Sequence, residues 1–316
     1  MIKLNTHQIL LICTNHSKYR SAGKSLIKKK KGIMEYSFVK DYKHDLKSRA
    51  SFCRLAKDTF GIDFESWFSK GFWNENYICY SMEHGGEIIS NVSVNLMRLM
   101  MNEQETAAIQ IGTVMTHPEH RRRGLAKSLL ERVIGDFSGS YTFFFLAADK
   151  AAVPLYESCG FETARTYRYE IDLAGYRRAG KPLEPVGIEP PELLEAKRSS
   201  VPLSRNLSAI GDEHVLMFYY LHGFASHIYR PWQDTLVIYE TEGDAVHIYD
   251  ILSPRKIKLE ELLERIAPKS AERAVCHFAP YEDIEGLSAH PDAQAGWMTR
   301  GGQFPARACF PRISQT

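Results

Sequence analysis

One stretch of the sequence gathers positive charge around a glycine. Four cationic side chains surround Gly124, and they are Arg121, Arg122, Arg123 and Lys127. A glycine at the start of a helix leaves the unpaired backbone N–H groups and the positive end of the helix dipole open to an anion. A side chain at Gly124 or Ala126 would hold that anion away from the backbone. The chemistry that this pattern predicts is the binding of a phosphate or pyrophosphate.

Two elements must position this loop. Residues 108–116 are apolar and β-branched, which predicts a buried strand, and Pro118 ends it because proline removes a ladder donor. A helix follows from Gly124. Its apolar residues recur every four positions and form one stripe that faces a sheet, at Leu125, Leu129, Val133 and Phe137.

The spacing Arg121-x-x-Gly124-x-Ala126 after a strand resembles the acetyl-CoA-binding signature of the GNAT superfamily of N-acetyltransferases. A second stretch strengthens the resemblance. Residues 141–147 read as the next buried strand, and the A-x-x-L-Y-x-x-x-G-F pattern that ends at Phe161 places Tyr156 on a short helix. This pattern is similar to the second signature of the same superfamily. Two signatures in this order make the resemblance specific, and it covers residues 34–173.

The resemblance implies an α/β fold with a mixed, twisted sheet flanked by helices. A bulge in the strand at 108–116 makes it splay from the strand at 141–147, so that the thioester lies between them. Tyr156 is then the general acid for the leaving thiolate, and Asp149 stands where relatives often have an asparagine that contacts the pantetheine arm. The implied cofactor-binding residues are Val114, Met115, Thr116, Arg121, Arg122, Arg123, Gly124, Leu125, Ala126, Lys127 and Asp149.

The activity implied is transfer of an acetyl group from acetyl-CoA to a primary amine of a small molecule, by direct attack through a tetrahedral intermediate and without a metal. Gln110 stands where some acetyltransferases carry a glutamate base, and an amide cannot take a proton. This substitution keeps a non-catalytic acyl-CoA sensor open as an alternative. Protein N-termini and lysines also remain open as acceptors.

The chain of 316 residues is long enough for two domains. Residues 1–33 carry eight Lys or Arg and no acid, which indicates a disordered basic extension and makes Met34 a candidate start. The acetyltransferase domain is expected over 34–173, with 166–173 as its closing strand. A linker rich in Gly and Pro follows at 174–192, and a smaller α/β domain at 193–316.

The second domain repeats the strand, helix, strand order of the first. Expected strands at 236–240, 245–252 and 274–278 surround an amphipathic helix at 259–266. The further expected elements are helices at 191–199 and 214–220 and a last strand at 308–313. The loop before Leu259 has no glycine pair, so we interpret this domain as a degenerate GNAT-like half that binds no cofactor.

Helices are expected at 41–56 and 60–72, before a hairpin of strands at 77–82 and 88–99. The aromatic run between Phe64 and Trp73 fits a core better than an acceptor pocket. One face of the hairpin is lined by small polar residues, Asn91, Ser93 and Asn95 among them, and fits a solvated face or a pocket wall equally well.

The amino-acid composition limits which kinds of partner the protein can be expected to have. No stretch approaches the roughly 18 apolar residues of a membrane span, and the six scattered cysteines indicate reduced thiols in a cytoplasmic protein. Beyond residue 33 the net charge is −6, which favours a cationic small molecule over nucleic acid. His117 and His120 are expected in a surface turn. The sequence leaves the acceptor, the general base, the role of the second domain and the oligomeric state open.

Overall fold

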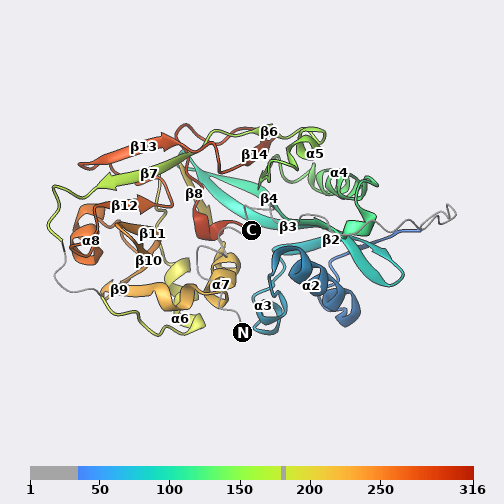
Figure 1. Ribbon diagram of the computed structural model, residues 1–316, viewed down its shortest axis with the longest axis horizontal. Coiled ribbons are helices and arrows are strands. Elements are labelled where there is room, and N and C mark those ends of the chain that lie inside the picture. The colour runs from blue at the N-terminus through green and yellow to red at the C-terminus, as the bar shows by residue number, and fades with distance from the viewer. Residues whose placement is uncertain (1–34, 179–182) are drawn as a thin grey trace.

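The computed structural model describes residues 35–178 and 183–316. The expected extension at 1–33 and the candidate start at Met34 lie outside these residues. The described part of the chain folds into two mixed sheets with helices packed on them (Figure 1). The expected α/β class is confirmed.

The first sheet has eight strands among the described residues, in the order β1-β2-β3-β4-β5-β14-β6, and β8 adds to the free edge of β3 beyond β2. Only the β4–β5 pair is parallel. The strands are β1 (Ser37–Lys40), β2 (Tyr77–His84), β3 (Glu87–Met101), β4 (Gln104–Thr116), β5 (Phe143–Ala147), β6 (Glu162–Thr163), β8 (Leu207–Ile210) and β14 (Trp297–Arg300).

Helices cover both faces of the first sheet (Figure 1). On one face lie α4 (Leu125–Phe137), after the 3-10 turn η1 (Pro118–His120), and α5 (Val153–Glu157), while α2 (Leu46–Phe60) and α3 (Glu65–Ser69) cover the other. The helix expected at 60–72 is shorter than predicted. Gly61 has φ 75° and ends α2, so the chain must turn before α3 begins.

The second sheet has six strands in the described residues, in the order β13-β7-β12-β11-β10-β9. They are β7 (Tyr167–Asp172), β9 (Ile228–Trp232), β10 (Thr235–Glu242), β11 (Ala245–Leu252), β12 (Arg273–Cys276) and β13 (Leu287–Pro291). The accompanying helices are α6 (Pro190–Arg198), α7 (Glu213–Leu221), the 3-10 turn η2 (Phe224–His227), α8 (Leu259–Ile266) and the 3-10 turn η3 (Arg312–Ser314).

The two sheets exchange strands, which corrects the expected role of residues 166–173. These residues form β7, which pairs with β12 and β13 of the second sheet instead of closing the first. In return, β14 inserts between β5 and β6, and β8 pairs with β3. Alternation along a strand says which residues share a face but not which strand lies beside it. A boundary at 174 therefore does not separate the two sheets.

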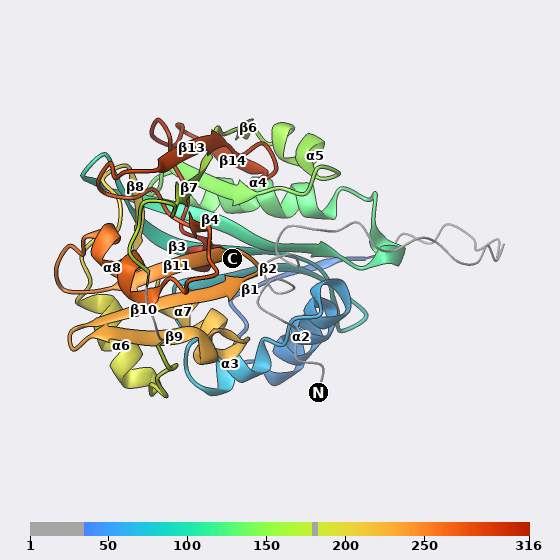
Figure 2. The same cartoon turned by 60° about the vertical axis from the view of Figure 1, so that its left-hand side comes forward.

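The strand expected at 308–313 is also wrong. Pro311 interrupts this stretch, and proline has no N–H for a ladder. It forms an irregular path that ends in η3. Two views show the end of this segment in the middle of the molecule, beside β3 (Figures 1 and 2).

We predict that a fragment of residues 34–173, the expected first domain, does not fold on its own. Phe143 and Phe145 on β5 pack against aromatic side chains that lie far along the chain, namely Trp297, Phe304 and Phe310. Removing them exposes this cluster and the edge of β5. Thermal unfolding followed by circular dichroism should show no cooperative transition until a 174–316 fragment is added. A cooperative transition of the short fragment alone would contradict the exchange.

Candidate active site

A bulge in β4 lies beside the predicted phosphate loop. Asn91 and Ser93 on β3 pair with Met115 and Gly112, so three steps along β4 match two along β3. Thr113 lies inside this bulge with φ 46°, which a β-branched residue rarely adopts. The bulge that the resemblance implied is therefore present, and it re-aims the backbone after Gly112.

The same stretch of β4 leaves its parallel neighbour. Pairing with β5 covers Ala108, Ile109 and Gln110 and then stops, although β4 continues to Thr116. Three predicted contact residues, Val114, Met115 and Thr116, lie in this unpaired stretch; Met115 is buried and the other two are half-buried. On the side that faces β5, this stretch of β4 is no longer paired with it. This is the geometry expected if the two strands splay apart and leave a wedge between them.

The loop that follows is shaped as the sequence predicts. Gly124 has φ 77° and directly precedes α4, and Arg122 also has a positive φ of 60°. The Arg121 Nε atom donates to the carbonyl of Thr116 at 2.9 Å, and one Arg123 Nη atom donates to the carbonyl of Glu119 at 3.1 Å. These bonds tie the loop to the end of β4.

The residues around Gly124 fit a pyrophosphate. The three arginine side chains are exposed, whereas Leu125 turns into the core and both Ala126 and Lys127 are half-buried. A Cβ on Gly124 would meet no heavy atom within 4 Å, so the space in front of the helix start is open. Its positive φ excludes most side chains all the same.

Tyr156 lies on α5 with 5% of its surface exposed. It belongs to the same buried cluster as Ile111 on β4 and Leu146 on β5, the two strands that splay. Burial, with smaller contributions from Asp149 and Cys159, raises the pKa of Tyr156. Asp149 itself is half-buried, in the turn before α5, where its carbonyl accepts from the N–H of Ala152.

The polar face of the hairpin is not solvated, since Asn91, Ser93 and Asn95 are all fully buried. Tyr42 bonds Ser81 at 2.6 Å, Ser81 donates to Asn91 at 2.8 Å, and Asn91 donates onward to Ser93 at 2.9 Å. A second Asn91 bond, to the carbonyl of Thr113 at 2.9 Å, holds the bulge. The solvated face, one of the two interpretations that the sequence left open, is therefore wrong, and the pocket wall stays a prediction. We call this buried face the polar wall.

Residues of the second half complete this wall, and no sequence pattern indicated them. The imidazole of His214, on α7, bonds the side chain of Asn95 through Nε2 at 2.5 Å. Thr316 donates from its backbone N–H at 3.0 Å and its hydroxyl at 2.7 Å to the Oε1 atom of Gln110. A Cβ on Gly112 would lie 2.7 Å from the Thr316 hydroxyl, which shows how closely this segment covers β4.

Buried aromatic rings support the wall from behind. Phe64, Trp67 and Trp73 are each at most 5% exposed and pack together in one cluster with Phe52 and Tyr77. The expectation of a core is confirmed. The Trp67 indole also donates to the carbonyl of His214 at 2.8 Å, so this core fixes the first turn of α7.

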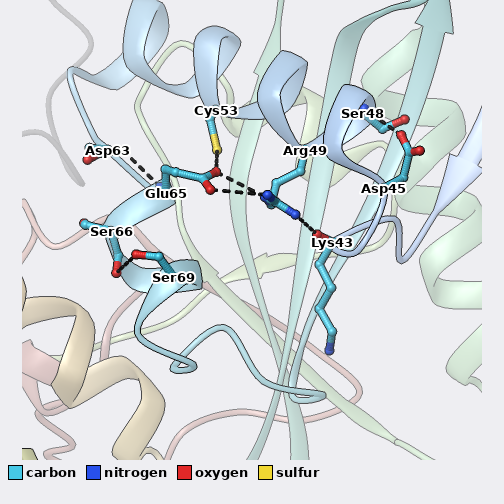
Figure 3. Close-up of polar contacts among 9 residues, drawn as sticks. All are labelled: Lys43, Asp45, Ser48, Arg49, Cys53, Asp63, Glu65, Ser66 and Ser69. Carbon is cyan, nitrogen blue, oxygen red and sulfur yellow. Dashed lines mark hydrogen bonds and ion pairs between the residues drawn. The ribbon is translucent and has the colours of Figure 1, made fainter.

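An ion pair fastens α2 to α3 at the outer side of this core (Figure 3). The Arg49 guanidinium bonds Glu65 at 3.1 Å and the carbonyl of Lys43 at 2.6 Å, and it stacks on Phe68. Figure 3 also shows the Cys53 thiol against Glu65. Burial, together with Glu65, raises the pKa of Cys53 to about 12, so this thiol stays protonated.

The two histidines beside the cofactor loop have different surroundings. His117 caps η1 by accepting from the N–H of Glu119, as expected for a turn residue. His120 is buried instead and bonds the hydroxyl of Tyr36 at 3.1 Å. The expected surface-turn role therefore holds for His117 but not for His120.

The second sheet has a similar bulge and splay, but it lacks a glycine-containing loop like the one before α4. Strand β11 pairs with β12 only up to Ile248, and a register shift places Tyr249 in a bulge against β10. Here, however, the N–H of Val201 bonds the carbonyl of Ser253 at 2.9 Å, and no glycine precedes α8. A neighbouring segment thus bonds the chain directly after β11.

Among the described residues, no group of three or more His, Cys, Asp or Glu side chains is arranged to hold a metal ion. The five cysteines in this part of the chain are all free thiols. None of its helices is long and apolar enough to cross a membrane.

Comparison with known proteins identifies the class. Residues 18–164 match the family model of the acetyltransferase (GNAT) domain. No curated protein sequence matches the chain.

Solved structures extend the likeness to both sheets. A probable N-acyltransferase from Enterococcus faecalis V583 superposes with a TM-score of 0.61 at 14% identity, over 84% of this chain and 72% of that one. A GCN5-related N-acetyltransferase from Anabaena variabilis gives 0.59 at 17%, with 84% and 72% covered. One from Kribbella flavida gives 0.57 at 14%, with 84% and 71% covered.

The family match covers residues 18–164, a little under half of the chain, and is to a GNAT acetyltransferase domain. The solved structures show that the fold extends over both sheets. The second sheet, with its own bulge and splay, is consistent with a second GNAT-like half.

Gly124→Val should abolish cofactor binding without unfolding the protein. A β-branched residue at φ 77° is strained, and its side chain would stand in front of the helix N-terminus. Isothermal titration with acetyl-CoA measures the loss. Gly135→Val, near the other end of α4 and also with no atom within 4 Å of its Cβ, is the matched control and should bind normally. Unchanged affinity in folded Gly124→Val would remove the cofactor assignment.

His214 should make the fold sensitive to acid. Burial lowers the pKa of His214 to about 4, from 6.5 in the unfolded chain. Its contribution to stability is therefore complete above pH 6.5 and is lost as the pH falls toward 4, by roughly 3 kcal/mol. Urea unfolding at pH 7 and pH 4.5 tests this. His214→Gln should lose less stability over this interval than the wild type, and equal losses would contradict the prediction.

Proposed function

We propose that this protein transfers an acetyl group from acetyl-CoA to a primary amine of a small molecule. The observation that carries the proposal is the bulge at Thr113, which ends the β4–β5 pairing directly before the Arg-rich helix start. This arrangement offers a wedge for the pantetheine arm and an anion site for the pyrophosphate. The buried polar wall on the other face of the sheet is where we place the amine.

Two groups of residues bind the two ends of the cofactor. The exposed arginines and the N–H groups at the start of α4 neutralise the pyrophosphate. The backbone N–H groups of Val114–Thr116 that point away from β3, where pairing with β5 has ended, face the pantetheine amide and the thioester oxygen. They stabilise the negative charge that grows on that oxygen during attack. Asp149 is placed near the pantetheine arm, but its carboxylate cannot donate the bond that an asparagine would.

Direct attack by the amine fits the thiols of the site. Cys79 is the cysteine of the polar wall, and burial raises its pKa well above that of a free thiol. Cys53, between α2 and α3, is held protonated as well. Because thiolates rather than thiols are nucleophiles, neither residue suits a covalent acetyl intermediate.

We assign Tyr156 as the general acid. As the carbon–sulfur bond breaks, its hydroxyl gives a proton to the sulfur and regains one from solvent. Its raised pKa keeps the hydroxyl protonated at the pH values where amines become neutral. No hydrogen bond of the hydroxyl is found within residues 35–178 and 183–316, so a structural bond does not account for the buried tyrosine.

A cavity between the two halves has room for a small molecule, although none of the polar-wall residues Asn91, Ser93 and Asn95 lines it. Its volume is about 430 Å³, within the size range of small-molecule sites. It is lined by residues of both sheets and of the segment before α7; among them, Asp212 and Asp250 share the ammonium of Lys197 at 3.4 and 2.9 Å. Arg98, Arg198 and Glu213 also line the cavity, so its charges balance. The net charge of −6 beyond residue 33 is what favours a cationic acceptor. A protein lysine or N-terminus remains the alternative acceptor.

The rival function is a non-catalytic acyl-CoA sensor, which Gln110 in the place of a glutamate base favours. Release of free thiol from acetyl-CoA separates the two functions. The panel of amines should include a polyamine, an amino acid, an aminoglycoside and a lysine peptide. Transfer predicts thiol release with at least one small amine, with acetylated amine formed in equal amount. Tight acetyl-CoA binding with no release from any amine would establish the sensor.

Tyr156→Phe should lower kcat by roughly 10²-fold or more and leave acetyl-CoA affinity nearly unchanged, because only the proton donor is removed. The alkaline part of the pH–rate profile should flatten or move. Tyr80→Phe is the control, since Tyr80 is a buried tyrosine of the same cluster whose hydroxyl bonds Asp136. Wild-type turnover in Tyr156→Phe would mean that the thiolate leaves unassisted.

A further inference from the structure

Several buried nitrogen atoms on the polar wall have no hydrogen-bond partner in the described part of the chain. They are Asn95 Nδ2, Gln110 Nε2, His214 Nδ1 and Gln315 Nε2. Each of these side chains belongs to a residue that is at most 3% exposed. Burying an unpaired polar atom costs about 1–3 kcal/mol, so a group of them calls for an explanation other than stability.

Three of the four atoms belong to one place on the sheet. Asn95 and Gln110 are direct partners in the β3–β4 register, so their side chains share a face. His214 reaches the same face by its bond to Asn95. This face lies where the β4–β5 pairing ends, at Gln110.

The hydrogen bonds assign the orientation of each group. Gln110 Oε1 accepts twice from Thr316, which directs its NH₂ group elsewhere. His214 Nε2 faces the carbonyl oxygen of the Asn95 side chain, so this nitrogen carries the proton and donates it. The unpartnered Nδ1 atom is then the lone pair of a neutral imidazole.

We propose that His214 is the base of the acetyl transfer, accepting at Nδ1 the proton that the attacking amine loses. This inference rests on the proposed function and names a residue of the second half as part of the site. Asn95 is the positioning residue, because it holds the tautomer in which Nδ1 is free. The unpaired amide of Gln110 is suited to hold a water that links the amine to Nδ1.

The proton balance is simple. The bond from nitrogen to the acetyl carbon forms while the nitrogen still carries its extra proton, which becomes far more acidic once that bond exists. The proton passes to Nδ1, directly or through the water, and the resulting imidazolium keeps its Nε2–H bond to Asn95. It returns the proton to solvent after the product leaves. A base of low basicity suffices at this stage, since it acts on the intermediate and not on the free ammonium.

The charges around His214 are few. Asp212, which precedes it at the start of α7, is the charged group that acts on its pKa, and Lys197 pairs with that carboxylate. From α3 the neutral Trp67 ring faces the imidazole, and from β3 the neutral Asn95. A neutral resting imidazole follows from these surroundings.

The test compares His214→Gln with His222→Gln in the full chain. His222 lies on the last turn of α7 and serves as the control, because both of its ring nitrogens already have partners, the carbonyls of Phe218 and Asp63. We expect kcat/KM of His214→Gln to fall by roughly 10²-fold or more with acetyl-CoA affinity unchanged. Its rate should then rise tenfold per pH unit toward the pKa of the amine. His222→Gln should keep the wild-type profile.

Asn95→Asp provides a second readout if His214→Gln does not fold. A carboxylate that accepts from Nε2 raises the pKa of the imidazole, so the acidic limb of the kcat/KM profile should move upward. A wild-type rate and pH profile in folded His214→Gln overturns the proposal, and so does an unmoved profile in Asn95→Asp. If the wild type itself releases no thiol with any amine, the proposed function fails and this inference fails with it.

Discussion

The structure depends on one irregularity in β4. Strand β4 must pair with β3 along its whole length and with β5 along only part of it, and the extra residue at Thr113 reconciles these demands. Without the bulge, β4 would continue beside β5 and close the wedge. Asn91 holds the bulge by donating to the carbonyl of Thr113, and Arg121 ties the next loop to the carbonyl of Thr116. The proposed anion site at Gly124 is therefore positioned by the same strand that leaves β5.

The second half builds one wall of the first. Helix α7 and the segment that ends at Thr316 reach the polar face of β3 and β4, and β8 and β14 extend the same sheet. Its own sheet has a similar bulge and splay, but the segment at Val201 adds to the end of β11 there. The second half thereby completes the polar wall of the first. The strand exchange makes that role permanent, because neither sheet is complete without the other part of the chain.

Local patterns predicted the local structure well. The apolar period of the helix at Leu259–Ile266 and the alternation in β10 and β11 predicted their positions closely, and Gly124 was correctly placed at the start of a helix. What the sequence could not predict are contacts between distant segments. His214 and Asn95 are 119 positions apart, and Thr316 and Gln110 are 206 apart. The short strands β13 and β14 were missed because their few residues carry no clear alternation, and their partners lie elsewhere in the chain.

Hydrogen exchange with and without acetyl-CoA tests the central claim most directly, because it reports on both sheets in one experiment. The account predicts that the cofactor slows exchange of the amides at Val114–Thr116 and at the first turn of α4. The amides at Ser253 and the start of α8, in the corresponding part of the second sheet, should be unaffected. Protection confined to the second sheet, or of equal size in both, would contradict the claim that the bulge at Thr113 opens the cofactor cleft.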